Sequence, residues 1–165
     1  MPGAVEFGDR FGSDVSAADT NGDGYVDLAV GVKGEMIGDS PFPAGGVTVL
    51  RGSTSGVSGT GSRWYDYATP GVAGETTEEG WLGASVQLRD YNRDGRAVLV
   101  AAAPEAGRLY VLPGTTSGPT GTGSFLIDAP SLTNFWAQLA DRPASSLPPV
   151  LPRRSPACAS AQPQP

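Results

Sequence analysis

The chain has 165 residues and a formal net charge of −6, with no histidine and a single cysteine, Cys158. This length allows one ordinary domain, the lack of histidine removes the commonest general base and zinc ligand, and a lone cysteine excludes an intrachain disulfide. Lys33 is the only lysine, so the clustered cations that nucleic acids and anionic membrane surfaces require are missing and we expect neither as a partner.

Glycine and proline account for 24 and 15 residues and separate short apolar runs. This pattern is typical of short strands joined by tight turns, so we expect an all-β fold. No stretch approaches the roughly 20 apolar residues of a membrane-spanning helix. Residues 1–12 lack the apolar core of a signal peptide, so the chain is expected to be either cytoplasmic or a piece of a longer protein.

The first unit opens with "FGSDVSAAD" at Phe11–Asp19 and continues through a loop, "DTNGDGYVD", into the apolar run "LAVGV". Val, Leu and aromatic residues between glycine-rich segments predict four strands. We expect the strands at Ser13–Ala17, Tyr25–Val32, Val47–Leu50 and Trp64–Tyr67. The glycine-rich "RGSTSGVSGTGS" is interpreted as a flexible hairpin connection. The aromatic residues Trp64, Tyr65, Tyr67 and Trp81 are expected to pack in the core.

The loop "DTNGDGYVD" has the composition of a calcium site. Calcium binds about six to eight oxygen atoms, and closely spaced carboxylates supply them. Counted from Asp19, side-chain oxygens stand at positions 1, 3, 5 and 9, and a main-chain carbonyl is available at position 7; the residues are Asp19, Asn21, Asp23, Asp27 and Tyr25. An EF-hand needs an acidic residue at position 12, where this chain has Val30, so that interpretation fails.

The alternative is a turn that binds nothing, because Asp, Asn and Gly also favour tight turns. A turn alone does not need three carboxylates, and their mutual repulsion would cost stability without a cation. The sequence therefore predicts a Ca²⁺ site in a hairpin loop.

A second unit repeats this order. "LGASVQLRD" begins at Leu82, a loop "DYNRDGRAV" follows, and "LVAAA" comes 71 residues after its counterpart; "GRLYVLPGTTSGPTGTGS" then follows at an offset of 62 residues. Such self-similarity indicates a repeated structural unit. The strands are expected at Ala84–Leu88, Arg96–Ala103, Leu109–Leu112 and Phe125–Asp128.

The second loop offers Asp90, Asn92 and Asp94, but Val98 replaces the last carboxylate. Three arginines also crowd this loop and oppose a dication; they are Arg89, Arg93 and Arg96. Weak calcium binding completed by water is one interpretation. The one we favour is a turn kept for its shape, in which Arg–Asp pairs replace the ion.

We therefore expect a first repeat unit over residues 1–68 and a second over 69–132. Residues 133–165 are rich in Pro, Ala and Ser and show no strand periodicity, so we expect a disordered tail. Residues 2–12 resemble residues 70–83, which join the two units, and the chain is expected to begin at the exit of a preceding unit. The repeat pattern stops at about Asp128.

Phe11-Gly12, the Asp/Asn loop and Ala102-Ala103-Pro104 together resemble the FG-GAP repeat, which builds the β-propeller of integrin α subunits and of many bacterial secreted proteins. The resemblance covers about residues 2–128. It implies four-stranded blades arranged radially and a calcium ion held by Asp19, Asn21, Asp23, Tyr25 and Asp27 in the first blade. Two positions depart from the family pattern: Gly31-Val32-Lys33 stands at the Gly-Ala-Pro position, and Leu82 replaces phenylalanine.

Two blades form an incomplete propeller, so we expect the chain to need further blades or self-association to close. We expect a non-enzymatic, calcium-binding fragment that serves protein interaction or structure, with a secreted or extracellular parent. Its partner is an unknown protein or surface ligand, and the insertion Glu35–Ala44 is the favoured contact surface. Two alternatives stay open: an accessory part of a secreted hydrolase, and a truncated or frame-shifted reading frame without its own function.

Overall fold

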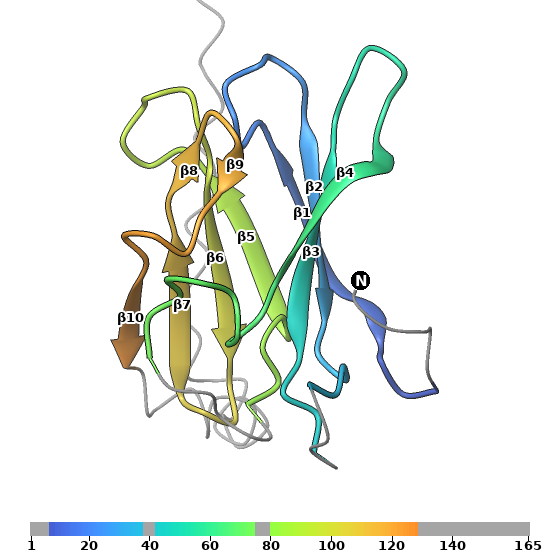
Figure 1. Cartoon of the computed structure of the whole chain (residues 1–165), viewed down its shortest axis with the longest axis vertical. Helices are drawn as coiled ribbons and strands as arrows, with labels where there is room; N and C mark the ends of the chain where they lie inside the picture. Colours follow the sequence, from blue (N-terminus) through green and yellow to red (C-terminus); the bar gives the residue numbers. More distant parts are fainter. Residues whose placement is uncertain (1–6, 38–41, 75–79, 129–165) are drawn as a thin grey trace, which may run out of the picture.

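The computed structural model describes residues 7–37, 42–74 and 80–128, and all regular structure in these ranges is β-strand (Figure 1). The first four-stranded antiparallel sheet has the order β1-β2-β3-β4, and the second has the order β5-β6-β7-β10. Along the chain, a short hairpin of β8 and β9 lies between β7 and β10, which pair with each other in the second sheet. The strands are β1 Phe11–Ala18, β2 Asp27–Val32, β3 Gly46–Arg51, β4 Ser58–Tyr65, β5 Ser85–Arg89, β6 Val98–Ala103, β7 Arg108–Leu112, β8 Gly114–Thr115, β9 Gly118–Pro119 and β10 Phe125–Asp128.

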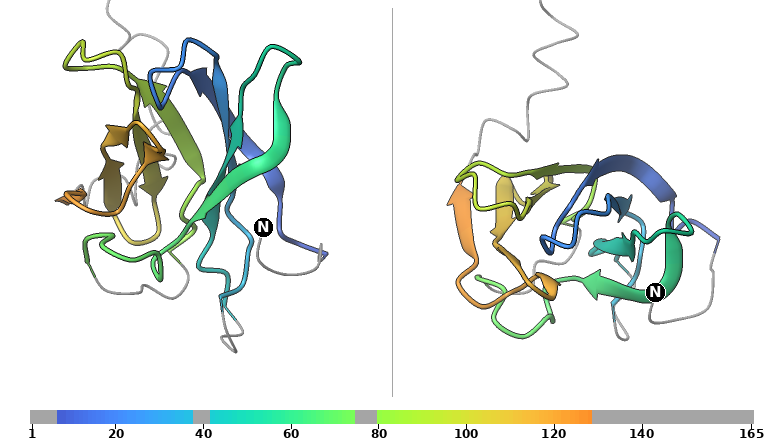
Figure 2. Two further views of the ribbon diagram at one scale, coloured as in Figure 1. Left: turned by 45° about the horizontal axis from the view of Figure 1, so that its top comes forward. Right: turned by 90° about the horizontal axis from the view of Figure 1, so that it is seen from above.

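The predicted all-β class with two four-stranded units is confirmed. Each unit is a meander in which consecutive long strands are neighbours, and the two sheets stand face to face with the hairpin β8–β9 beside them (Figure 2). The sheets do not close into a ring, as expected for two blades of an incomplete propeller. Residues 133–165, expected to be a disordered tail, lie outside the described residues, and the boundaries between the units remain a prediction.

Several strand bounds were predicted wrongly. Tyr25 precedes β2 because its N–H donates to Asp23 Oδ1 of the loop, at 2.8 Å, and so belongs to the turn. Tyr67 lies beyond the end of β4, which instead begins at Ser58. The glycine-rich segment is therefore partly strand and not only a flexible connection, since Arg51 pairs with Ser58 across an irregularity of the ladder. Its counterpart in the second unit forms β8 and β9.

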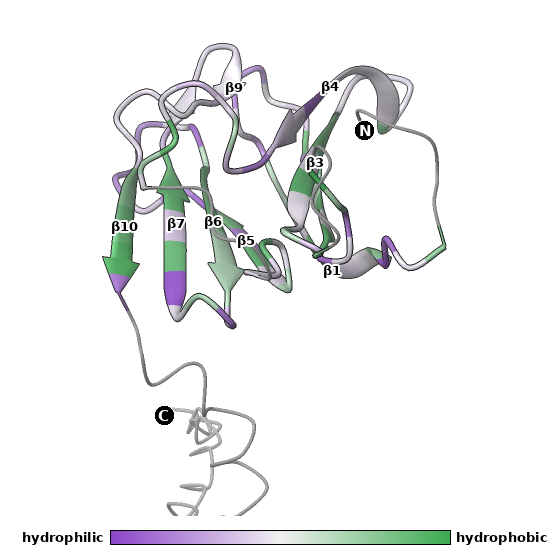
Figure 3. Cartoon of the chain, turned by 60° about the horizontal axis from the view of Figure 1, so that its bottom comes forward, coloured by the Kyte–Doolittle hydropathy of each residue, from purple (hydrophilic) through white to green (hydrophobic). Residues whose placement is uncertain are grey.

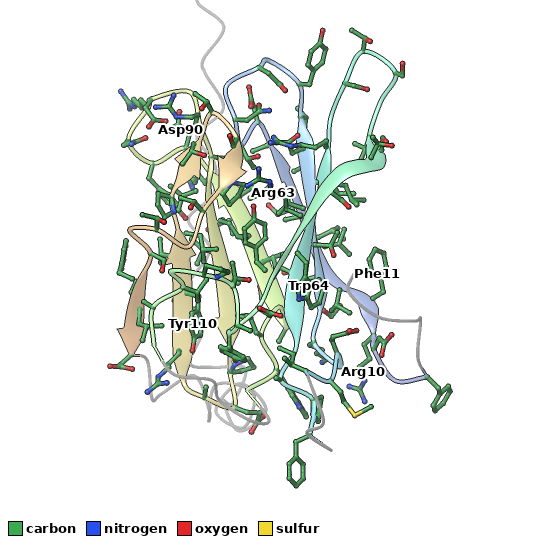
Figure 4. All side chains as sticks on the ribbon, viewed as in Figure 1. Arg10, Phe11, Arg63, Trp64, Asp90 and Tyr110 are labelled. Carbon is green, nitrogen blue, oxygen red and sulfur yellow. The ribbon has the colours of Figure 1, made fainter. Side chains whose placement is uncertain are left out.

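The hydrophobic core lies between the two sheets. Alternate residues of β2 and β3 point into it from the first sheet, and alternate residues of β5, β6 and β7 from the second. Tyr67 and Tyr110 meet there edge to face, with ring centres 5.3 Å apart, and Figure 4 shows Tyr110 among the side chains between the sheets. The core members on the strands are Ala29, Val47, Val49, Tyr65, Val86, Leu88, Leu99, Ala101, Ala103, Tyr110 and Leu112.

The aromatic predictions are partly correct. Tyr65 and Tyr67 are buried in the core, whereas Trp64 lies on the opposite face of its sheet and donates its Nε1–H to Asp66 at 2.8 Å. Trp81 was expected in the core but is only half-buried. Its ring lies 5.4 Å from Lys33 Nζ at the rim of a surface hollow, because a cation is attracted to the aromatic face.

Two glycines allow the two sheets to approach closely at one end. A Cβ atom on Gly31 would lie 2.0 Å from the carbonyl oxygen of Gly83, and one on Gly83 would lie 2.2 Å from that of Gly46. Gly83 also has a φ of 83°, which L-residues rarely adopt. The two sheets therefore approach at this end through bare backbone.

Polar side chains of β1 complete the contact between the sheets. Asp14 Oδ2 accepts hydrogen bonds from the Val86 N–H at 2.9 Å and from Ser85 Oγ at 2.8 Å. Ser16 Oγ accepts one from the Leu88 N–H at 2.9 Å. These acceptors satisfy N–H groups on the edge of β5 that faces away from β6, its only strand partner.

Among the described residues, no helix is long and apolar enough to cross a membrane.

Candidate metal centre

The two Asp/Asn loops lie at the same end of the molecule. One connects β1 to β2 and the other connects β5 to β6 (Figure 1). Figure 4 marks the second by Asp90. The loops are in contact, because the Ala97 N–H donates to the main-chain carbonyl of Asp19 at 2.7 Å. The first loop is therefore supported by the second repeat.

Asp19 organises the first loop. Its Oδ1 accepts hydrogen bonds from the N–H groups of Asn21 at 3.0 Å and Gly22 at 2.7 Å, and its Oδ2 accepts one from Gly24 at 2.8 Å. Partial burial works against ionisation, but these N–H donors outweigh it and lower the pKa of Asp19 below its usual value. The carboxylate is thus ionised and held in place by the turn that it caps.

Asn21 and Asp23 repeat this arrangement one step further on. Asn21 Oδ1 accepts from the Asp23 N–H at 3.0 Å, and Asp23 Oδ1 accepts from the Tyr25 N–H at 2.8 Å. The Asn21 amide also donates to Asp23 Oδ2 at 2.6 Å. Successive side-chain to backbone bonds of this kind mimic turns and fix the loop without any ion.

Asp27 differs from the other candidate ligands because its side chain is fully buried. Its Oδ1 accepts from the Gly52 N–H at 2.9 Å, and its Oδ2 accepts from the Thr20 N–H at 3.2 Å and from the Thr20 hydroxyl. Arg51 Nη1 lies 3.5 Å from Oδ2 and supplies a compensating charge. Asp27 therefore joins the loop to the end of β3 through contacts that need no ion.

Sequence reasoning missed Arg51 and Thr20. Besides facing Asp27, Arg51 donates through Nη2 to the carbonyl oxygen of Ser117, in the hairpin β8–β9 of the second repeat. One signal was available: the positions that correspond to Asp27 and Arg51 in the second repeat are Val98 and Pro113, so both charges are lost together.

The donors of the first loop suit calcium in their chemistry. They are three carboxylates and an amide, all hard oxygen ligands, and each oxygen that accepts one N–H keeps a second lone pair. Within residues 7–37, 42–74 and 80–128, however, no three acidic or cysteine side chains converge as a ready metal cluster. Calcium binding would therefore require the carboxylates of this loop to move closer together, and Asp27 would share its carboxylate between the ion and its present donors.

The second loop has the same backbone frame. Asp90 accepts from the Asp94 N–H at 3.2 Å and the Gly95 N–H at 2.9 Å, and Asn92 Oδ1 accepts from the Asp94 N–H at 3.3 Å. Asp94 accepts from the Arg96 N–H at 2.9 Å, and the Arg96 guanidinium lies 3.2 Å from its Oδ2. The Arg96 N–H, followed by the Asn92 amide, lowers the pKa of Asp94. The Arg96 guanidinium thus pairs with one of the carboxylates of this loop.

Comparison with known proteins gives two results. The FG-GAP repeat family matches residues 11–50, which span β1 to β3 and the first loop. A phosphatidylinositol-glycan-specific phospholipase D from Dictyostelium discoideum is 28% identical over 148 residues, an alignment that covers 79% of this chain. The chain spans only 15% of the length of that relative.

Proposed function

We propose that this chain, whose residues 11–50 carry an FG-GAP repeat, is a non-enzymatic, calcium-binding pair of propeller blades that serves protein interaction or structure. The observation that carries the proposal is the frame of the first loop, where Asp19, Asn21 and Asp23 are held by backbone N–H groups beside the buried Asp27. A loop whose backbone is already fixed in a turn lowers the entropic cost of ordering its side chains around a cation.

The proposed ligands are the side chains of Asp19, Asn21, Asp23 and Asp27, with the main-chain carbonyl of Tyr25. When bound, calcium would offset the repulsion between the three carboxylates and so stabilise the connection between β1 and β2. Calcium concentrations outside cells suit a site of this modest charge, and we propose a secreted or extracellular parent protein.

Calcium titration of the full chain tests the metal site. We expect the melting temperature to rise with calcium at millimolar concentration, to stop rising in Asp23→Ala, and to rise normally in Asp94→Ala, the matched change in the second loop. Stabilisation by a ligand that binds only the folded state follows from mass action. An unchanged melting temperature of the wild-type chain at several millimolar calcium would show that the site does not bind it.

A second candidate function is an accessory role beside a catalytic domain. The observation that favours it is the similarity to a phospholipase D whose length far exceeds that of this chain. In that case the catalytic groups belong to another part of the parent protein, because this chain has no histidine to serve as a general base or a zinc ligand. Phospholipase assays on the full chain should then show no activity, whereas turnover abolished by one of its point substitutions would contradict both proposals.

A further inference from the structure

The outer face of the second sheet is apolar and faces away from the core. Phe125 and Ile127 of β10 are 53% and 45% exposed, and β6 and β7 add Val98, Val100, Leu109 and Val111 beside them. Figure 3 shows hydrophobic residues along β10, β7 and β6. The remaining side chains that line this hollow are uncharged; they are Gln87, Tyr91 and Pro113. A continuous uncharged face of this kind is typical of an interaction surface.

The repeat shows what sort of surface covers this face. By the offsets of 71 and 62 residues, Val100 corresponds to Ala29, Leu109 to Val47, Val111 to Val49 and Ile127 to Tyr65. All four counterparts are buried beneath the second sheet. The exposed outer face of the second sheet is therefore formed by the same repeat positions as the face of the first sheet that the second sheet covers.

The chain also carries the complementary surface. The residues of the second sheet that cover the first include Val86, Leu99 and Ala101, and their counterparts Val15, Leu28 and Val30 lie on the outer face of the first sheet. Val30 is already buried there and Leu28 is half-buried, so β1 supplies the exposed part of this face. Val15 and Phe11 of β1 are 56% and 54% exposed, and Phe11 projects away from the second sheet (Figure 4).

The polar contacts repeat as well. Within the molecule, Asp14 and Ser16 of β1 accept the edge N–H groups of Val86 and Leu88. Their counterparts on β5 are Ser85 and Gln87. Ser85 Oγ donates to Asp14 and Gln87 Oε1 accepts from the Tyr91 hydroxyl, and each oxygen keeps a lone pair for the edge of another β1 strand. The two outer faces are therefore matched both in apolar surface and in hydrogen-bonding groups.

We propose that a second copy of this chain docks the outer face of its first sheet, around Val15 and Phe11, onto the outer face of the second sheet, around Phe125 and Ile127. Such an interface joins unlike faces, so copies associate head to tail and form a ring or an open array. The loss of both Asp27 and Arg51 at the corresponding positions Val98 and Pro113 favours this contact, because it removes a buried charge pair from the docking face.

Light scattering after size-exclusion chromatography of the full chain tests the proposal. We expect masses above the 16.8 kDa of one copy, rising with concentration. Ile127→Asp and Val15→Asp each place a charge on one of the two faces and should raise the dissociation constant at least tenfold. Val57→Asp is the matched control, since Val57 is 49% exposed but lies outside both faces in the connection before β4. Circular dichroism should show that all three variants keep the β-sheet fold.

Mixing the two variants distinguishes a head-to-tail interface from a symmetric one. Each retains one intact face, so an equal mixture of Ile127→Asp and Val15→Asp should form a dimer of one copy of each and nothing larger. A wild-type chain that stays monomeric at all concentrations would overturn the proposal. This outcome would also be expected if residues 129–165 of the same copy, and not a second copy, occupied the face. A dimer that Ile127→Asp disrupts and Val15→Asp leaves intact, with no recovery on mixing, would overturn it too.

Discussion

The two Asp/Asn loops share a backbone frame but differ in what fixes their far end. In both, the first Asp, the Asn and the second Asp accept N–H groups of the turn that follows each of them. At the ninth position the first loop has the buried Asp27, bonded to Thr20 and Gly52, whereas the second has the apolar Val98. The first six residues thus specify the turn, and the ninth residue decides whether a charged side chain is buried beside the loop.

The partner of the ninth residue changes with it. Asp27 lies beside Arg51, while their counterparts Val98 and Pro113 line one apolar hollow. The glycine after each partner is retained, because a Cβ on Gly52 would lie 2.3 Å from the Val26 carbonyl and one on Gly114 would lie 2.5 Å from that of Ala97. The same close backbone approach thus occurs in both repeats, beside the charged pair of Asp27 and Arg51 in the first and beside the apolar pair of Val98 and Pro113 in the second.

Removing the ninth side chain should give the largest difference between the two repeats. Asp27→Ala leaves the N–H groups of Thr20 and Gly52 and the guanidinium of Arg51 without their buried acceptor, so we expect the free energy of unfolding to fall by about 3 kcal/mol. Val98→Ala deletes two methyl groups from a half-exposed site and should cost about 1 kcal/mol. Urea unfolding in the presence of EDTA measures both.

Equal losses in Asp27→Ala and Val98→Ala would show that the buried hydrogen bonds of Asp27 stabilise the metal-free chain no more than the apolar contacts of Val98 do. Arg51→Met is a useful companion, because it removes the charge and keeps most of the length of the side chain. It should cost less than Asp27→Ala, since Thr20 and Gly52 keep their acceptor.

Much of the fold could be predicted from the sequence because it is encoded twice. The repeated order of glycines, loop and apolar run located both sheets, and the apolar run Leu99–Ala103 lies within β6, whose Leu99, Ala101 and Ala103 are buried. Strand bounds were less predictable, since they depend on competition for single N–H groups. Tyr25 has a strand-like side chain, but its N–H is bonded to Asp23.

The candidate site was predictable only in part. The spacing of Asp19, Asn21 and Asp23 indicates a tight turn, and the structure has that turn. The burial of Asp27 and its pairing with Arg51 depend on how β3 lies beside β2, which local spacing does not encode. Likewise, the half-buried position of Trp81 follows from its contact with Lys33 across two repeats, which a count of apolar residues does not reveal.

Converting the second loop into the first tests the comparison in the opposite direction. The double change Arg96→Tyr and Val98→Asp removes the guanidinium next to Asp94 and restores the fourth side-chain ligand. If calcium binds the first loop, the converted loop should add stabilisation of about 1.4 kcal/mol at tenfold excess over its dissociation constant. Calcium-dependent melting in an Asp23→Ala background isolates this second site. No calcium response there would mean that the ninth position does not decide metal binding.

The smallest expected difference concerns Asp14, whose counterpart in the second repeat is Ser85. Burial opposes ionisation of Asp14, but the Val86 N–H, the Ser85 hydroxyl and the Val15 N–H outweigh it and lower its pKa below the usual 3.8. A lowered pKa stabilises the folded state above the unfolded value, and this stability is lost as the pH falls through the folded value. Asp14→Ala should therefore cost about 1 kcal/mol at pH 7, and the gap to wild type should begin to narrow as the pH falls below about 3.8. Ser85→Ala keeps the Val86 bond and should cost less. Urea unfolding from pH 7 to pH 3 measures all three chains, and a gap that widens in acid would contradict the assignment.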